Sequence, residues 1–449
     1  MGWGGRIVLV NGTPYTWERT DLKSHQMEAW TFPVSIAPKS SSTIYLEWDE
    51  GILLNESKDT GDVTYQLAGT SSSFQVLGRS DGHHKYHLQI YLSGMETQNH
   101  PRGYVFDLGF IHNGDVNFIL SGKEGNFCSI NPPIDWMHSF LPTLGSRTLR
   151  EICIPGSHDA GMSTRSGGTA FAVKDNVITQ TGPVSFQLQA GSRYFDLRPA
   201  ISAGHYVAGH YSYVDPLKSW QGGNGQSFDD VISQINDFTS RNRELVIVDL
   251  SHDLNTDVGN SSYRALTQDE WNTLLDKFKN QLQHLYVAPD PVNIDLSTLR
   301  LGDIISTQPA VIVIVRADNR SVNIDAYNSS GFYRSSQLNI YNSYSNSPDL
   351  DTMSTDQYKK MAAQRTSPDS GLFLLSWTLT QDAADAIGSV VSVKHSILDL
   401  AKIANPAIYK SLLAQCTSNC FPNVLYIDGM DSSDITALAM AVNNSTVIG

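Results

Sequence analysis

LVIVDL, at residues 245–250, is a run of apolar and β-branched residues that ends in one carboxylate and one leucine. The segment after it, at 267–286, places its apolar side chains on one helical stripe, the face that a helix buries against a sheet. Similar apolar runs recur on both sides: ICI at 152–154, RYFDLR at 193–198, VIVIVRA from 311, GLFLLSW from 371 and VLYIDG from 424. Buried strands that alternate with helices indicate a mainly parallel α/β fold. We therefore predict an irregular TIM-type (β/α) barrel over residues 135–449, closed by a last helix around ITALAMAVNN.

The first 122 residues show a different pattern. Short segments rich in β-branched and aromatic residues are separated by Gly, Ser, Asn and Asp: RIVLVN, STIYLEW, DVTYQLA, SFQVLG, YHLQIYL, YVFDLGF and DVNFILSG. This spacing predicts an antiparallel, all-β sandwich domain over residues 1–122. KEGNFCSINPP opens a polar, proline-containing linker at 123–134, and a short helix around Trp136 and Phe140 follows it.

Charge and composition exclude some classes of partner. The 449 residues hold 45 Asp and Glu against 31 Lys and Arg, a formal net charge of −14, and no block of consecutive basic residues is present. Binding to nucleic acid by counterion release is therefore not expected, and neither is non-specific attraction to anionic membranes. Contact with lipid would have to come from exposed apolar and aromatic side chains.

The sequence does not fix a compartment. The first thirty residues lack a basic segment followed by an apolar core, and no apolar run approaches the length of a membrane span, so we expect a soluble chain, cytoplasmic or secreted. Four cysteines are too few for a disulfide framework, although Cys416 and Cys420 are close enough in sequence for one local bridge.

The first chemical motif is IPGSHDAGM at 154–162, in which an apolar strand ends at Pro155-Gly156 and presents His158 and Asp159. Barrel folds build their active sites from ionisable groups at the carboxyl ends of strands. By itself, such a pair is more often a helix cap or a surface loop.

Two further motifs add an anion-binding group and a second imidazole. In RYFDLRPA, Asp196 and Arg198 are two residues apart on a strand, so both face the barrel interior while Phe195 and Leu197 face the helices. An interior Asp–Arg pair is either a structural ion pair or a phosphate clamp. His210 follows in VAGHYSY, twelve residues after Arg198.

In this order and spacing, the three motifs resemble the X region of phosphatidylinositol-specific phospholipases C, most closely the small metal-independent bacterial type and its fungal relatives. The resemblance covers roughly residues 135–445. It implies that His158 is the general base, His210 the general acid and Arg198 the residue that holds the phosphate. It also implies that Asp159 orients His210 and that Asp428, in LYIDG, pairs with His158. Asp196 matches the second acidic residue of the Arg198 strand.

The chemistry of a phosphodiesterase fits these residue types. In-line cleavage needs a base on the nucleophile, an acid on the leaving oxygen and a cation on the phosphoryl oxygens. Two imidazoles and one guanidinium supply all three. The calcium-dependent members of the family have acidic residues where this chain has Asp-Leu-Arg, so Arg198 would replace the cation. We expect no metal and no other cofactor, and a phospholipid substrate at a membrane surface. The resemblance implies phosphatidylinositol, with diacylglycerol and inositol 1,2-cyclic phosphate as products.

Recognition of the head group departs from the family pattern. Arg316 matches an inositol-contacting arginine and Tyr344 a tyrosine that stacks on the ring, but Asn342 stands where the family has an acidic contact. The expected lysine after LVIVDL is replaced by Ser251 or His252. Amide and small polar groups bind hydroxyls more weakly than charged groups, so inositol specificity is less secure than phosphodiester cleavage.

Several alternatives stay open at this point. DLSHD at 249–253 looks like a metal cluster, but alternate residues at a strand end face opposite sides and no further ligand spacing supports it. His205 competes with His210 for the acid role by proximity. The sandwich domain is either a packing domain or a lipid- or glycan-binding module with aromatic groups such as Trp30 or Trp48 at its surface. The whole chain is alternatively a metal-dependent glycerophosphodiesterase-like enzyme, or an inactive lipid- or glycan-binding protein.

Overall fold

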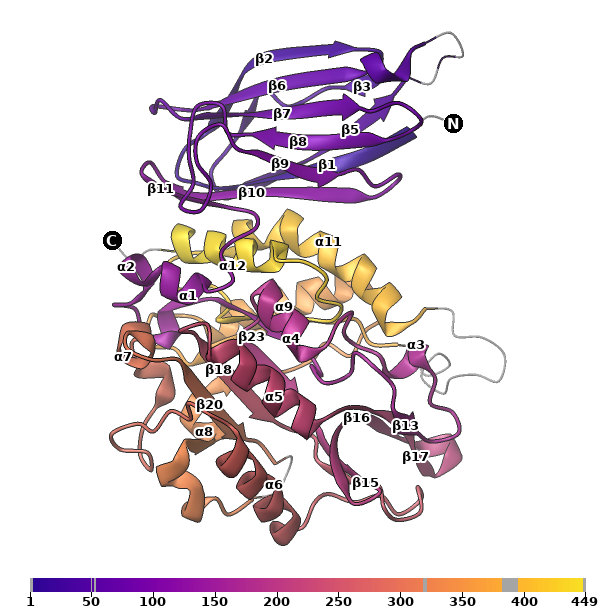
Figure 1. Cartoon of the computed structure of the whole chain (residues 1–449), viewed down its shortest axis with the longest axis vertical. Coiled ribbons are helices and arrows are strands. Elements are labelled where there is room, and N and C mark those ends of the chain that lie inside the picture. The colour runs from indigo at the N-terminus through magenta and orange to yellow at the C-terminus, as the bar shows by residue number, and fades with distance from the viewer. Residues whose placement is uncertain (1–2, 50, 52–53, 318–320, 382–394, 447–449) are drawn as a thin grey trace. The chain divides into compact units, whose positions relative to one another are not determined.

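A computed structural model describes residues 3–49, 51, 54–317, 321–381 and 395–446 (Figure 1). The contacts within the chain divide it into two compact units. One comprises residues 1–132, 406–418 and 437–449, and the other comprises residues 133–405 and 419–436. The predicted boundaries at 1–122, 123–134 and 135–449 stay a prediction.

Residues 3–129 of the first unit form two sheets, and the helical residues 406–415 and 437–445 also belong to this unit. A five-stranded sheet has the order β11-β10-β1-β5-β3, and a six-stranded sheet has the order β4-β2-β6-β7-β8-β9. The strands are β1 (Trp3–Gly12), β2 (Trp17–His25), β3 (Met27–Trp30), β4 (Ser35–Ile36), β5 (Ser40–Trp48), β6 (Thr60–Leu67), β7 (Ser73–Ser80), β8 (Tyr86–Tyr91), β9 (Val105–Gly109), β10 (Asp115–Lys123) and β11 (Asn126–Ser129). Their pairing is antiparallel except for β1 with β10, which run parallel, so the prediction of a wholly antiparallel arrangement is wrong for this pair.

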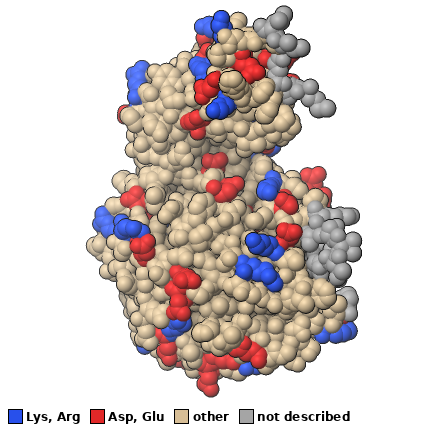
Figure 2. Space-filling view, turned by 45° about the vertical axis from the view of Figure 1, so that its right-hand side comes forward, with Lys and Arg blue, Asp and Glu red and all other residues tan. Residues whose placement is uncertain are grey.

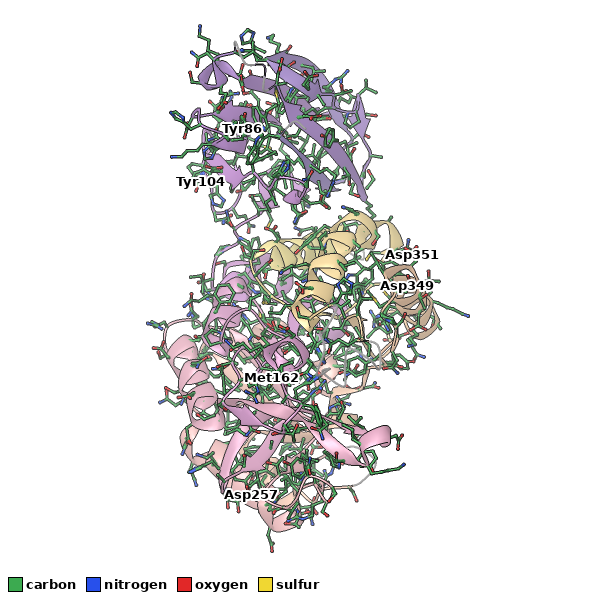
Figure 3. The ribbon with its side chains drawn as sticks, turned by 90° about the vertical axis from the view of Figure 1, so that its right-hand side faces the viewer. Tyr86, Tyr104, Met162, Asp257, Asp349 and Asp351 are labelled. Carbon is green, nitrogen blue, oxygen red and sulfur yellow. The ribbon has the colours of Figure 1, made fainter. Side chains whose placement is uncertain are left out.

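Aromatic side chains from the two sheets contact one another inside this unit. Trp17 lies against Phe118 with ring centroids 6.4 Å apart, and Trp48 stacks on Tyr86 at 4.5 Å. Trp30 and Trp48 are only 6% and 0% exposed. The prediction that these two tryptophans reach a membrane or glycan surface is therefore wrong, because both are consumed in core packing. The exposed aromatic residues include Tyr104, at 40% (labelled in Figure 3).

The second unit is organised by an eight-stranded sheet in the order β21-β20-β18-β14-β12-β24-β23-β22. All of its pairs are parallel. Its strands are β12 (Ile154–Ser157), β14 (Tyr194–Leu197), β18 (Leu245–Leu250), β20 (Ala310–Val315), β21 (Phe332–Arg334), β22 (Ile340–Tyr341), β23 (Leu372–Trp377) and β24 (Val424–Ile427). The sheet is curled. Among the described residues no ladder joins its two edge strands, β21 and β22, so it forms a half-barrel. The α/β class is confirmed, and the irregular TIM-type barrel stays the finer prediction.

Each predicted strand run corresponds to one of these strands, with one shift. The first strand begins at Ile154 and includes Pro155 and Gly156, whereas the sequence predicted that it ends there. The strand extends through Gly156 because this residue pairs with Tyr194 of β14 and with Tyr426 of β24. A side chain at Gly156 would approach Val424 Cγ1 to 2.5 Å, so only glycine fits between the neighbouring strands.

Helices connect the strands. They are α1 (Trp136–Ser139), α2 (Leu141–Leu144), α3 (Lys174–Val177), α4 (Val184–Ala190), α5 (Phe228–Thr239), α6 (Gln268–Gln281), α7 (Leu301–Ile305), α8 (Ser335–Leu338), α9 (Leu350–Gln364), α11 (Ile397–Gln415) and α12 (Asp434–Ser445). Thr267 and Glu270 form a capping box at the start of α6. The helix ends at Gln281, five residues earlier than the predicted 286, although Leu282 itself remains in the core.

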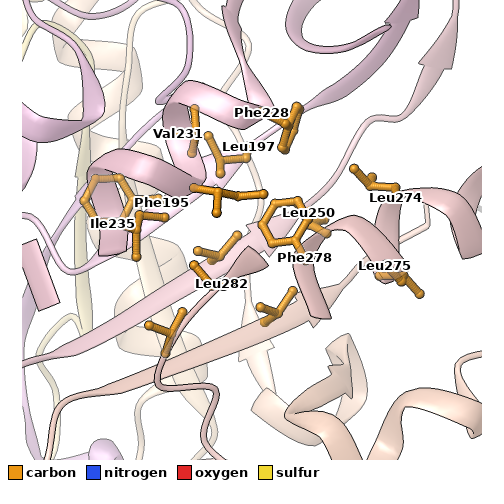
Figure 4. Packing of buried hydrophobic residues seen from close by; sticks show 14 of the residues in the cluster. Phe195, Leu197, Phe228, Val231, Ile235, Leu250, Leu274, Leu275, Phe278 and Leu282 are labelled. Carbon is orange, nitrogen blue, oxygen red and sulfur yellow. The ribbon is translucent and has the colours of Figure 1, made fainter. Parts of the chain in front are cut away.

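The core between the sheet and its helices fixes the orientation of β14. Phe195 and Leu197 are fully buried with Phe228 and Val231 of α5 and with Phe278 of α6 (Figure 4). Because side chains alternate along a strand, the intervening residues of β14 must face the other side of the sheet. This confirms the predicted outward packing of Phe195 and Leu197.

A second sheet extends from the carboxyl ends of these strands, in the order β13-β17-β16-β15-β19. It consists of β13 (Gly167–Gly168), β15 (Pro199–Ser202), β16 (His205–Val214), β17 (Ser219–Ser227) and β19 (Leu254–Asn255). Met162, labelled in Figure 3, is buried in a cluster with Ala172, Val177 and Ala208. The sequence did not predict this sheet, because its glycine-rich strands lack an apolar alternation.

Two further findings concern the cysteines and the length of the helices. Across the described residues, which include all four cysteines, there is no disulfide, so Cys416 and Cys420 are not bridged. In the described part of the chain every helix is too short or too polar to cross a bilayer.

A buried ion pair anchors the amino-terminal end of β14. Arg193 Nε lies 2.7 Å from Glu244 Oε2, and both side chains are 0% exposed. Removing one member of such a pair leaves an uncompensated buried charge, so we expect Arg193→Ala to lower the free energy of unfolding by about 3–5 kcal/mol. Urea denaturation measures it.

The matched control is Arg241→Ala, which breaks an ion pair between Arg241 and Asp237 whose side chains are both 65% exposed. Solvent screens such pairs, and little change is expected. Equal midpoints for the two variants would contradict the assignment of Arg193 as an anchor.

Candidate active site

His158 and Asp159 lie directly after β12, in a turn held by the neighbouring strands. The His158 N–H donates to Ile427 O at 3.1 Å, and the Ala160 N–H donates to Asp196 O at 2.7 Å. Asp159 has a φ of 40°, in the left-handed region that few residues other than glycine occupy. The turn therefore presents two consecutive ionisable side chains in fixed directions.

His158 is oriented by a buried carboxylate. Its Nδ1 lies 2.6 Å from Asp428 Oδ1, and the Asp428 side chain is 4% exposed. Because a carboxylate accepts the hydrogen bond, Nδ1 carries the proton and Nε2 presents its lone pair. That Nε2 accepts a hydrogen bond from Arg198 Nη2 at 2.7 Å.

His210 is the second imidazole of the site. It lies on β16, and its Nδ1 is 2.7 Å from Asp159 Oδ2. A register shift between Val207 and Gly209 interrupts the strand just before it, and such bulges re-aim the side chains that follow. His205, the sequence alternative for the acid role, is the exposed first residue of the same strand.

Arg198 lies beside His158 and close to Asp159, the carboxylate that contacts His210. Besides His158, its guanidinium contacts Asp196 Oδ2 through Nε at 3.1 Å and lies 3.6 Å from Asp159 Oδ2 through Nη1. Burial lowers the pKa of Arg198, but the charges of Asp196 and Asp159 outweigh that effect and raise it. The guanidinium is therefore permanently charged.

Asp196 is a structural anion rather than a proton donor. It accepts hydrogen bonds from the Asp159 N–H at 3.1 Å and from Ser251 Oγ at 2.5 Å, in addition to Arg198. Burial alone would raise the pKa of Asp196, but Arg198, the imidazoles of His252 and His158 and the hydrogen bond from Ser251 together outweigh burial and hold that pKa below its ordinary value. Asp196 thus stays ionised and holds the guanidinium in place.

Two tyrosines complete this network, one predicted and one not. Tyr344 OH accepts from Arg198 Nη2 at 3.2 Å, and Tyr426 OH donates to Asp196 Oδ2 at 2.6 Å. Sequence reasoning missed Tyr426. The signal was present, because Tyr426 precedes Asp428 by two positions and such residues share one side of a strand.

The residues predicted to bind the head group are only partly brought to this network. Arg316 forms a two-pronged ion pair with Asp249, with Nη2 2.9 Å and Nε 3.1 Å from Asp249 Oδ2. Tyr194 also donates to that carboxylate. The sequence did not predict this pairing. The first aspartate of DLSHD is therefore held by an arginine.

The remaining two predicted contacts differ in position. Ser251 is buried against Asp196, whereas His252 is exposed and its Nδ1 lies 2.8 Å from Ser251 Oγ. Of the two candidates for the missing lysine, Ser251 therefore reaches the site interior. Asn342 follows β22, and its buried Oδ1 has no hydrogen-bond partner among the described residues.

The positive charge at the site comes from a side chain, the guanidinium of Arg198. Throughout the described part of the chain, no three His, Cys, Asp or Glu side chains converge as metal ligands. On the face shown in Figure 2, basic and acidic side chains are interspersed among the described residues rather than gathered in one basic area. The cation at the centre of the site is Arg198.

A comparison with curated proteins found one match that bears on the family resemblance. No family model matches the sequence. The human PI-PLC X domain-containing protein 2 is 26% identical over 166 residues, a match that covers 29% of this chain and 50% of that protein. Over those residues the chain resembles a PI-PLC X-domain protein. It spans about half the length of the curated relative that it matches.

Two solved structures of this class are similar to the chain. The phosphatidylinositol-specific phospholipase C from Listeria monocytogenes is 17% identical, with a TM-score of 0.47, over 69% of this chain and 98% of that one. A mutant of the phosphatidylinositol-specific phospholipase C from Staphylococcus aureus is 16% identical, with a TM-score of 0.45, over 70% and 98%.

Proposed function

We propose that this chain is a phosphodiesterase that cleaves phosphatidylinositol, or a phospholipid with a related head group, by acid–base catalysis from two histidines. His158 is the base, His210 the acid and Arg198 the group that stabilises the phosphoryl oxygens. Asp428 and Asp159 orient the two imidazoles, and Asp196 orients Arg198.

One observation carries the proposal. Each imidazole bonds through Nδ1 to a buried carboxylate, which leaves Nε2 of His158 facing a permanently charged guanidinium. A carboxylate partner fixes the tautomer and the orientation of the ring. Acid–base pairs that flank an anion-binding group have the composition that in-line phosphoryl transfer requires.

The proposed reaction is an intramolecular transfer. His158 Nε2 removes the proton from the inositol 2-hydroxyl, and the oxygen forms a bond to phosphorus. The bond from phosphorus to the glycerol oxygen breaks, and His210 Nε2 donates its proton to that oxygen. The products are inositol 1,2-cyclic phosphate and diacylglycerol, and the two histidines end with their protonation states exchanged.

We expect the intact chain to release inositol cyclic phosphate from phosphatidylinositol vesicles in EDTA, at a rate that added calcium does not change. The physical reason is that Arg198 supplies the positive charge at the phosphate. Phosphorus NMR of the soluble products identifies the cyclic ester.

Two results would redirect the proposal. Activity that disappears in EDTA and returns with calcium or magnesium would favour the metal-dependent glycerophosphodiesterase alternative. Absence of any product, with phosphatidylcholine and glycerophosphodiesters also tried with and without these metals, would favour an inactive lipid- or glycan-binding protein.

The setting of the reaction belongs to the same proposal. The enzyme would act peripherally on lipid at a membrane surface through the irregular TIM-type barrel of residues 135–449, with the β-sandwich of residues 1–122 as an accessory domain. Arg316, Tyr344, Asn342 and Ser251 or His252 would contact the head group, with no metal or other cofactor.

A further inference from the structure

Four side chains of the site form a closed cycle of hydrogen bonds. Arg198 Nε donates to Asp196 Oδ2 at 3.1 Å, and Tyr426 OH donates to the same oxygen at 2.6 Å. Tyr426 OH lies 3.2 Å from Tyr344 OH, and Tyr344 OH accepts from Arg198 Nη2 at 3.2 Å. The guanidinium is thereby held at two of its nitrogens by one continuous network.

The donors of this cycle keep their protons. Burial raises the pKa of Tyr344 to about 12. Burial, followed by the nearby charge of Asp196, raises the pKa of Tyr426 well above its ordinary value. Both hydroxyls are therefore neutral donors over the working range of the histidines.

The cycle joins parts of the half-barrel that are far apart in sequence. Asp196 and Arg198 come from β14 and its end, Tyr426 comes from β24, and Tyr344 comes from the segment after β22. Strand β22 is an edge strand of the eight-stranded sheet. Tyr426 is the member that connects this edge to Asp196, because its hydroxyl contacts both Asp196 and Tyr344.

Arg198 depends on this connection. Its Nη2 is shared between His158 Nε2 and Tyr344 OH, and its Nη1 is no closer than 3.6 Å to Asp159 Oδ2. A phosphate that enters the site would compete with His158 for Nη2. Only the cycle then continues to fix the plane of the guanidinium, which decides whether it binds phosphate through two parallel hydrogen bonds.

We propose that Tyr426 is a positioning residue that holds Arg198 in the geometry required for phosphate binding, acting through Asp196 and Tyr344. The inference rests on the proposed function of Arg198 as the phosphate ligand. The inference has a further consequence. Tyr344, which would contact the head group, and Arg198, which would bind the phosphate, are held by the same hydrogen-bond cycle, so the two contacts are coupled.

Tyr426→Phe tests the inference, because it removes one hydroxyl and retains the ring that packs 5.2 Å from the His158 ring. We expect kcat on phosphatidylinositol vesicles to fall between about 10-fold and 100-fold, the size of effect that a small misplacement of a catalytic group produces. The inhibition constant of inorganic phosphate should rise by about 10-fold, since the same clamp binds that anion.

The matched control is Tyr333→Phe. Tyr333 is also fully buried in the eight-stranded sheet, and its hydroxyl donates to Tyr286 O and accepts from the Ala288 N–H, both at 2.8 Å. It makes an equally complete set of hydrogen bonds away from the site. Its removal should lower the melting temperature without changing kcat or phosphate affinity.

A double variant separates positioning from a general structural effect. Arg198→Lys removes the planar guanidinium that Tyr426 is proposed to position. In that background the loss of Tyr426 OH should have little further effect, so the losses in kcat and phosphate affinity from the two substitutions should be strongly non-additive. Additive losses, or a Tyr426→Phe variant that behaves like Tyr333→Phe, would overturn the inference.

The outcome remains readable if turnover fails. Phosphate affinity, measured from its protection against thermal unfolding, needs no catalysis. A parent chain that binds phosphate and loses affinity in Tyr426→Phe but not in Tyr333→Phe supports the inference even where the proposed reaction is absent. A parent chain that does not bind phosphate overturns it.

Discussion

Replacement of His210 by alanine is expected to lower kcat for phosphatidylinositol cleavage between about 100-fold and 10,000-fold, the usual contribution of a positioned general acid. The proposed acid protonates the glycerol oxygen as its bond to phosphorus breaks. Without it, diacylglycerol must leave as an alkoxide. Asp159 cannot take over, because it presents only acceptor atoms while it is ionised.

The measurement can be made specific to the leaving group. A substrate that releases a phenol of low pKa needs no acid, so His210→Ala should lose much less activity on it than on phosphatidylinositol. His158→Ala should lose activity on both substrates to a similar extent, because the nucleophile is the same. Equal losses for the two variants on both substrates would contradict the division of roles.

His205→Ala is the matched control. His205 lies on the same strand, five positions before His210, but it is exposed and its strand partner is Ser202. We expect its replacement to leave kcat unchanged on both substrates. A large loss there, with His210→Ala unaffected, would transfer the acid role to His205, the alternative that the sequence left open.

The sequence predicted the elements of the half-barrel well because buried parallel strands have a strong local signature. LVIVDL and VIVIVR are runs that only a doubly covered strand buries, and both became strands. Strand alternation also placed Phe195 and Leu197 in the helical core. The predicted end of the first strand was less accurate. Local patterns do not show that the two neighbouring strands continue to pair with β12 through Pro155 and Gly156.

Long-range polar pairings were the features that local patterns could not supply. Asp249 and Arg316 are each readable as a strand-end residue, but nothing near either one shows that they bond to each other. The burial of Trp30 and Trp48 was misjudged for the same reason, since it depends on the facing sheet. Tyr426 is different: it was missed although its spacing from Asp428 was enough to place it on the same side of the strand, and only its hydroxyl partner required the structure.

The second large effect is expected at Arg198. Arg198→Ala should lower kcat between about 100-fold and 1,000-fold, because it removes the preorganised donors that meet the charge developing on the phosphoryl oxygens. It should also abolish inhibition by inorganic phosphate at the concentrations that inhibit the parent chain. Steady-state rates in EDTA and phosphate inhibition constants measure both effects.

Arg198→Lys distinguishes charge from geometry. Lysine keeps the positive charge but offers a single point of contact, and it cannot bond Asp196, Tyr344 and a phosphate at once through a planar fork. If geometry matters, the lysine variant should recover phosphate binding only weakly and kcat hardly at all. Full recovery of both would mean that any cation suffices at this position, and the hydrogen-bond cycle around Arg198 would then have no part in catalysis.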